Sequence, residues 1–159
     1  VIASAQNVVN RTKSICVGLE PCVIPALGHS NFKIEDGTME FGVGHHGEAG
    51  TKVEKLKSAS EMAQEMAETI LNDFDFEEGK EVAVMLSGLG ATPVMELYVL
   101  YDEVEKVLAK AGHKVWKTYI GNYVTSLDMN GASLTIVDLD DEIKELLSEP
   151  AVPIGMKNY

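Results

Sequence analysis

The chain has 159 residues, of which 45% are hydrophobic and 24% are charged, and its formal net charge is -12 at pH 7. This length and composition predict one soluble globular domain over 1–159 with a core of ordinary size. The acidic balance argues against nucleic acid and anionic membranes as partners, and no apolar run approaches the ~20 residues that span a bilayer.

The beginning of the chain and its cysteines bear on its origin. The first residues predict the end of a helix over 3–9, and the sequence starts at Val1, so we expect a piece of a longer protein. No signal peptide is visible, and the only cysteines are Cys16 and Cys22. These features predict free, buried thiols in a cytoplasmic protein.

The next part of the sequence predicts a buried strand, a loop and a hairpin. The segment 12–19 is β-branched and apolar, as in a buried strand. Residues 20–32 contain two prolines and a glycine, which predict an irregular loop. Two short strands are expected within 33–43, around a tight turn at Asp36–Gly37.

The rest of the chain predicts alternating helices and strands. Ser58 and Glu61 match a capping box at the start of a helix, and the apolar run 82–86 predicts a strand that is buried on both faces. A long helix is expected to begin at Thr92–Pro93, with Thr92 as its N-cap. Three further elements are expected, namely strands over 114–120 and 132–137 and a helix over 140–147. This order predicts an α/β layered domain with a mixed β-sheet flanked by helices.

A glycine-rich loop over 42–50 is the most informative motif, and we call it the site loop. It carries two imidazoles and one carboxylate, those of His45, His46 and Glu48. Its four glycines allow sharp turns and a close approach of a small molecule to the backbone. Because histidine can act as a nucleophile or proton carrier near neutral pH, the loop predicts a site for a small polar substrate.

Two other interpretations of local motifs are weaker. His45, His46 and Glu48 are competent metal ligands, but neighbours on an extended chain point in opposite directions and no further His or Cys cluster is present, so no metal is predicted. The turn 88–93 suits a phosphate at a helix N-terminus, but Pro93 replaces the third glycine of a dinucleotide fingerprint. A tight strand-to-helix turn is therefore favoured there over a backbone cradle for substrate or partner.

Three isolated polar residues receive simpler interpretations. His29 and His113 stand alone in expected loops and are predicted to be solvated. Asp128 lies in a polar loop, where it can orient a histidine or cap a turn, and capping is favoured.

Four segments together resemble the dihydroxyacetone kinase family, in particular its DhaK-type substrate-binding module: 12–25, 40–50, 87–98 and 121–129. The segment 40–50 resembles the family block G-x-G-x-H-G-E-P-G. The resemblance extends over most of the chain but covers only the second half of the module. It implies that the first half, which supplies an acid/base aspartate, a histidine and further substrate contacts, has no counterpart here.

The resemblance implies a role for His46 above all. In the family, the histidine before Gly-Glu bonds to the carbonyl carbon of a short ketose as a hemiaminal, so His46 is the expected catalytic residue. Gly47 and Glu48 are expected to assist substrate binding, Glu48 by a hydrogen bond within the loop or by tuning the imidazole. The resemblance further implies a homodimer and a phosphoryl donor, either ATP or a phosphotransferase-system partner that holds ADP. The nucleotide and Mg are expected on a partner domain or subunit, so that this domain needs no cofactor and is inactive alone.

Two departures from the family block bear on the substrate. His45 stands where an aliphatic residue is frequent, and Ala49 replaces the frequent proline. They are compatible with a subgroup that binds a different ketose, such as one of four carbons. A non-catalytic ketose-binding coactivator or sensor is the alternative function, and a structural half-domain that mainly forms a dimer contact is a third.

Overall fold

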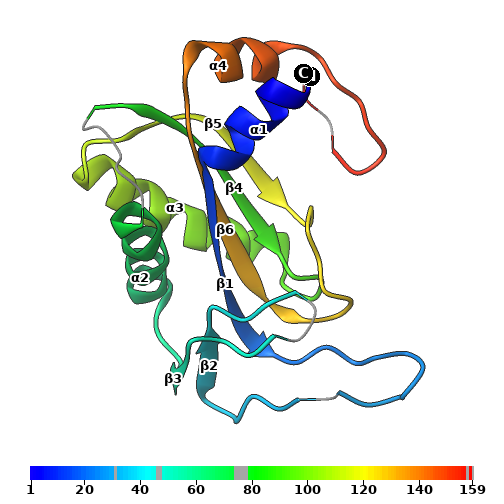
Figure 1. The fold of residues 1–159 in the computed structure, drawn as a ribbon. Coiled ribbons are helices and arrows are strands. Elements are labelled where there is room, and N and C mark those ends of the chain that lie inside the picture. Colours follow the sequence, from blue (N-terminus) through cyan, green and yellow to red (C-terminus); the bar gives the residue numbers. More distant parts are fainter. Residues whose placement is uncertain (31, 46–47, 74–78, 157, 159) are drawn as a thin grey trace.

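The computed structural model describes residues 1–30, 32–45, 48–73, 79–156 and 158. These form a six-stranded mixed sheet in the order β3-β2-β1-β6-β4-β5 (Figure 1). The strands are β1 (Thr12–Glu20), β2 (Thr38–Phe41), β3 (Lys52–Lys55), β4 (Glu81–Gly88), β5 (Lys114–Gly121) and β6 (Asn130–Asp138). The helices are α1 (Ile2–Asn10), α2 (Ala59–Asn72), α3 (Val94–Lys110) and α4 (Asp141–Ser148). The prediction of an α/β fold with a mixed sheet is confirmed.

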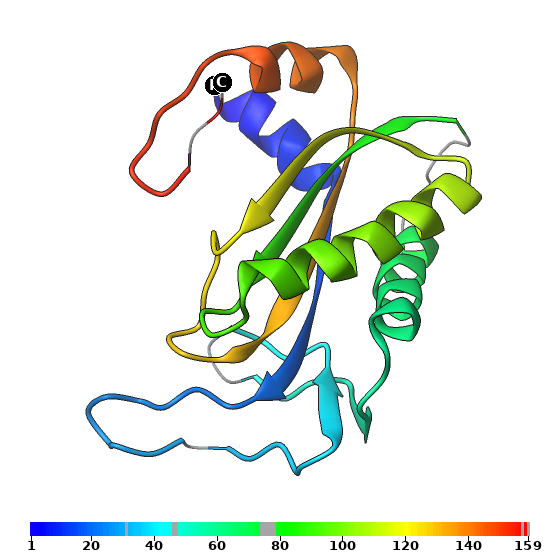
Figure 2. The ribbon, with the colours of Figure 1, turned by 180° about the vertical axis from the view of Figure 1, so that it is seen from behind.

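Helices α2 and α3 cover one face of the sheet (Figures 1 and 2). The main core lies between them and the central strands, because the strands β1, β4 and β6 send every second side chain toward this face. Its fully buried members include Val17, Met66, Leu86, Leu97 and Leu134.

The opposite face of the sheet is covered in two parts. At one end, α1 and α4 lie over a small cluster that contains Ala83, Leu139 and Ile143. At the other end, where β1 and β4 terminate, a second cluster consists of buried residues from strands and loops: Cys16, Cys22, Val43, Leu89 and Met129. The site loop lies at this second end. Among the described residues, no helix is both long and apolar enough to cross a bilayer.

The hairpin predicted within 33–43 is wrong. Only β2 forms there, and its antiparallel partners are β1 on one side and β3 on the other. The turn at Asp36–Gly37 precedes β2 and is closed by a 3.0 Å bond from the Thr38 N–H to the Glu35 carbonyl. Residues before the turn gain no strand partner, because the free edge of β2 is taken by the later segment 52–55, which the sequence pattern did not identify.

Helix starts were predicted with mixed success. The capping box of α2 is confirmed, since the Ser58 side chain accepts from the Glu61 N–H and the Glu61 side chain accepts from the Ser58 N–H. Thr92, in contrast, does not cap α3; Pro93 occupies the N-cap position. The Thr92 hydroxyl is buried and instead accepts from the Gly131 N–H at 2.8 Å and donates to the Gly131 carbonyl at 2.6 Å. A tertiary partner in β6 therefore replaces the local one.

The two isolated histidines differ from one another. His29 is exposed, as expected. His113 is only 7% exposed, which contradicts the prediction of a solvated loop residue. It follows the left-handed Gly112 at the end of α3 and leads directly into β5, so the helix and sheet enclose it.

Candidate functional site

The site loop leaves the sheet at the end of β2 and returns to it at β3. The Gly42 N–H donates to the Cys16 carbonyl on β1 at 2.7 Å, and the Thr51 N–H donates to the Phe41 carbonyl at 2.8 Å. Gly42 has a φ of +77°, a left-handed conformation that glycine adopts without a steric penalty. Both ends of the loop are thus fixed to strands of the sheet.

The predicted catalytic residue His46 and its neighbour Gly47 lie outside the described residues. The residues on either side of them are described. The Gly44 N–H donates to the Glu48 carbonyl at 2.9 Å, which ties the two sides of the loop together. A Cβ at position 44 would lie 2.7 Å from the Cβ of Glu48, so this close approach requires glycine. The side chain of Glu48, predicted to assist binding, is exposed.

The ring of His45 is directed into the protein rather than toward solvent. Its Nδ1 lies 3.8 Å from the Sγ of Cys16, and its Nε2 is buried with no hydrogen-bond partner among the described residues. Its carbonyl oxygen accepts a 2.8 Å hydrogen bond from the hydroxyl of Ser126. The imidazole of His45 therefore packs against Cys16 on β1.

Cys16 and Cys22 are both free and buried in the cluster beneath the loop, as predicted. Burial raises the pKa of the Cys16 thiol, although a hydrogen bond with Ser133 opposes the shift. A raised pKa keeps the sulfur protonated at neutral pH, and a neutral thiol is a poor nucleophile. Cys16 therefore serves as a packing partner of His45 and not as a reactive group.

One carboxylate at the end of the loop was not singled out from the sequence. The Oε1 of Glu40 accepts from the N–H of Gly50 at 2.6 Å, and a Cβ at Gly50 would lie 2.5 Å from the Phe41 carbonyl. Glu40 thus holds the returning side of the loop against β2. Its place within the family-like segment 40–50 was the available signal.

Two backbone N–H groups of the turn 88–92 are hydrogen-bonded within the protein. The Leu89 N–H donates to the Gly131 carbonyl at 3.1 Å, and the Ala91 N–H donates to the Met129 carbonyl at 3.0 Å. These two donors are therefore already used, as expected for a tight strand-to-helix turn. A phosphate would have to compete with both bonds.

The neighbouring loop 121–129 lies between this turn and the site loop. Asp128 accepts a 2.7 Å hydrogen bond from the N–H of Val23 and so ties the loop that follows β1 to the loop that precedes β6. The local turn-capping role favoured for Asp128 is therefore not what this bond provides, because its partner lies 105 residues away in another loop. No group of three or more potential metal ligands is found within the described part of the chain.

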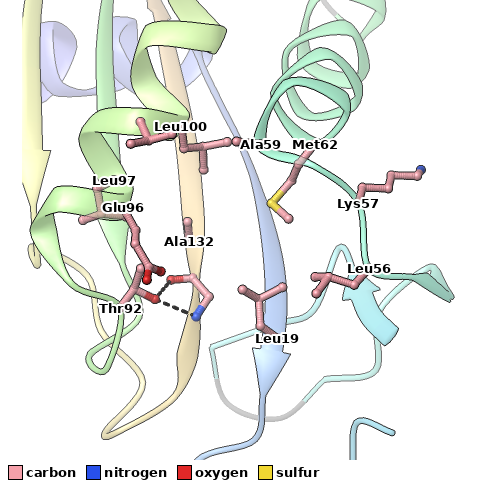
Figure 3. Close-up of a pocket in the computed structure, with 12 residues that line it drawn as sticks. Leu19, Leu56, Lys57, Ala59, Met62, Thr92, Glu96, Leu97, Leu100 and Ala132 are labelled. Atoms are coloured by element: carbon pink, nitrogen blue, oxygen red, sulfur yellow. Dashed lines mark hydrogen bonds between the residues drawn. The ribbon is translucent and has the colours of Figure 1, made fainter. Parts of the chain in front are cut away.

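A cavity of about 250 Å³ lies on the other face of the sheet, between α2 and α3 (Figure 3). Aliphatic side chains dominate its lining, among them Leu19, Leu56, Met62 and Leu100. No described residue of the site loop reaches it. Its apolar walls do not suit a polyhydroxy ketone, which needs hydrogen-bond partners for each hydroxyl.

Comparison with known families identifies the kind of protein. The Dak1 domain family matches residues 1–154, nearly the whole sequence, and the chain belongs to this family. This confirms the resemblance drawn from the four sequence segments.

Individual relatives are dihydroxyacetone and erythrulose kinases. The chain is 41% identical over 140 residues to the dihydroxyacetone-binding subunit DhaK of a PTS-dependent dihydroxyacetone kinase from Listeria innocua, covering 88% of this chain and 43% of the relative. It is 37% identical over 150 residues to a D-erythrulose kinase from Mycolicibacterium smegmatis, covering 94% of this chain and 26% of the relative. The chain thus spans less than half the length of these relatives.

A solved structure with the same fold is that of the dihydroxyacetone kinase operon co-activator Dha-DhaQ. It superimposes with a TM-score of 0.86 at 28% identity, covering 94% of this chain and 46% of that chain. The fold is therefore shared by kinase subunits and by a protein named as a co-activator.

Proposed function

We propose that this chain captures dihydroxyacetone, or a close short ketose, through the imidazole of His46 and presents it for phosphorylation. The observation that carries the proposal is the site loop itself. It resembles the family block, its backbone is hydrogen-bonded to β1 and β2, and the ring of its other histidine, His45, is directed into the protein. Kinase relatives over most of the chain support the same activity.

The capture step is a balanced addition. A lone pair of a neutral imidazole nitrogen of His46 attacks the ketone carbon, a C–N bond forms, and the C=O π electrons move to oxygen. The oxygen gains a proton and the ring loses its N–H proton, so that no group leaves. A polyol such as glycerol lacks the electrophilic carbon and is excluded by chemistry rather than by size. Capture also fixes the terminal hydroxyls, which is the main requirement of phosphoryl transfer.

The complete reaction needs parts beyond the residues described. We propose that the chain acts as the C-terminal half of a DhaK-like module, in a homodimer, and that the other half supplies acid/base and further substrate contacts. The phosphoryl donor is ATP or a phosphotransferase-system partner, with the nucleotide and Mg held by another domain or subunit. The Listeria relative, a subunit of a PTS-dependent dihydroxyacetone kinase, favours the second donor.

Two alternatives have specific support. A four-carbon ketose is favoured by the D-erythrulose kinase relative and by the departures at His45 and Ala49. A non-catalytic ketose sensor is favoured by the structural likeness to the co-activator. Both alternatives retain ketose binding by the site loop and differ only in which ketose is bound or whether it is phosphorylated.

Carbon-13 NMR with dihydroxyacetone labelled at the ketone carbon tests the proposal. We expect the native protein to convert the ketone resonance to that of a tetrahedral carbon, and His46→Ala to abolish the conversion. His29→Ala, a change of an exposed histidine outside the loop, is the matched control and should behave as the native protein. An unchanged tetrahedral signal in His46→Ala would contradict the assignment.

A further inference from the structure

The hydroxyl of Ser126 contacts the peptide that precedes His46. Its Oγ donates to the carbonyl oxygen of His45 at 2.8 Å, across 81 residues of sequence. That carbonyl belongs to the planar peptide group whose nitrogen is the backbone nitrogen of residue 46. A hydrogen bond to this oxygen therefore fixes the orientation of the peptide from which His46 extends.

Ser126 is itself held by two backbone hydrogen bonds. Its N–H donates to the Leu89 carbonyl at 2.7 Å, and its carbonyl accepts from the Met129 N–H at 3.0 Å. The hydroxyl thus starts from a backbone position that is fixed to the end of β4. Because serine has a single side-chain torsion before its oxygen, little freedom remains between this anchor and the His45 carbonyl.

The residue after Ser126 adopts a strained conformation. Leu127 has a φ of +53°, the left-handed region that side chains other than glycine rarely enter. Its side chain is 56% exposed, so burial of that side chain does not account for the strain. Gly90 lies directly beneath, where a Cβ would be 1.9 Å from the Leu127 carbonyl oxygen. The turn is therefore closely fitted, and its strain is offset by the contacts of the residues around Leu127.

A second contact of His45 involves its ring. Its ring nitrogen lies 3.8 Å from the sulfur of Cys16 on β1, while Ser126 bonds its carbonyl from the loop before β6. His45 is thus held at two points, by a side chain of β1 and by the loop that precedes β6. Of these two contacts, the serine contact acts on the peptide shared with residue 46.

From this geometry we propose that Ser126 is a positioning residue for ketose capture, acting through the carbonyl of His45 on the backbone of His46. The inference rests on the proposed function and adds a residue to it. Without its hydroxyl, the peptide can rotate, and the imidazole spends less time in the orientation that attacks the carbonyl carbon.

The test uses the protein in its full native length and dihydroxyacetone labelled at the ketone carbon. Ser126→Ala should lower the equilibrium constant for the tetrahedral adduct by about tenfold, the effect of one well-placed hydrogen bond. Ser126→Thr keeps a hydroxyl and should restore capture to within about threefold of the native value. The matched control is Thr125→Ala, at the exposed neighbouring position, which should leave capture unchanged. Circular dichroism checks that each variant is folded at the temperature of the measurement.

The outcomes separate this inference from the proposed function. Capture by Ser126→Ala equal to that of the native protein would overturn the positioning role, and so would a Ser126→Thr variant as weak as Ser126→Ala. If the native protein forms no adduct, or if the adduct persists in His46→Ala, the proposed function itself fails.

Discussion

At the scale of single residues, the candidate site depends on glycines that allow backbone segments to approach closely. Gly90 combines a φ of +133° with a carbonyl oxygen only 1.9 Å from where its Cβ would lie. Gly37 has a φ of +75° but open space around it, and Gly155 has neither constraint. Comparing substitutions at these three positions therefore distinguishes the cost of backbone strain from the cost of steric overlap.

We predict a graded response to alanine at these positions. Gly90→Ala should lower the free energy of unfolding by about 2–4 kcal/mol, because the turn and Leu127 must move apart. Gly37→Ala should cost about 1 kcal/mol from strain alone, and Gly155→Ala should stay within about 0.5 kcal/mol of the native protein. Urea denaturation measures all three; equal losses for Gly90→Ala and Gly37→Ala would show that the close contact is unimportant.

Sequence patterns recover single residues when their partners are local. The Ser58–Glu61 capping box spans four residues and was predicted correctly. The bond from Ser126 to His45 joins residues 81 apart and leaves no trace in local spacing. The glycine-rich loop could be recognised from the sequence, but the residues that hold it could not, because only the folded sheet brings them together.

At the scale of elements, Thr92 joins the start of α3 to the first residues of β6. Its buried hydroxyl bonds both the N–H and the carbonyl of Gly131 (Figure 3). Threonine followed by proline is a common helix start, so the sequence predicted a cap. The structure uses the same residue to connect two elements, which explains why the local interpretation was wrong.

Thr92→Val tests this connection, since it keeps the shape of the side chain and removes the hydroxyl. We expect a loss of about 1–3 kcal/mol in the free energy of unfolding, because buried backbone groups of Gly131 lose a partner. Thr69→Val is the matched control: its hydroxyl bonds the Glu65 carbonyl on the exposed side of α2. Thermal unfolding distinguishes them, and a smaller effect at position 92 than at 69 would count against the connecting role.

The strand pairing shows a second limit of sequence patterns. The strands β1, β4, β5 and β6 were all predicted, because each is long and apolar or β-branched. The short strand β3 is exposed at three of its four positions, Lys52, Val53 and Lys55, and shows no strong alternation. Its pairing with β2 is defined by the edge of the folded sheet. The prediction therefore placed the turn at Asp36–Gly37 correctly. It was wrong about the strand that pairs with β2, which is β3 and not the segment before the turn.

At the scale of the whole molecule, one carboxylate links the strands to α4. Glu81 on β4 forms ion pairs with Lys114 on β5 and Lys144 on α4, each at 2.7 Å. The hydrogen bond from Lys114, followed by that from Lys144, lowers the pKa of Glu81 from 4.5 to about 2. A lowered pKa in the folded state means that stabilisation is complete above pH 4.5 and is lost as the pH falls toward 2.

We therefore predict a pH-dependent effect of Glu81→Gln. The variant should melt below the native protein at pH 7. The difference should shrink progressively as the pH falls from 4.5 toward 2, because the Glu81 carboxylate of the unfolded chain takes up a proton at a higher pH than that of the folded protein. Glu35→Gln, in the turn before β2, serves as the control. Melting curves at several pH values measure the effect; a difference that grows on acidification would contradict the sign of the shift.

The central claim is that His46 bonds covalently to a short ketose. Its most direct test is a diffraction experiment on crystals of the full native protein soaked with dihydroxyacetone. The account predicts continuous electron density from a ring nitrogen of His46 to a tetrahedral C2 of the ketose, and none in His46→Ala crystals. Density for a planar, unattached ketone, or for an adduct on His45, would contradict it.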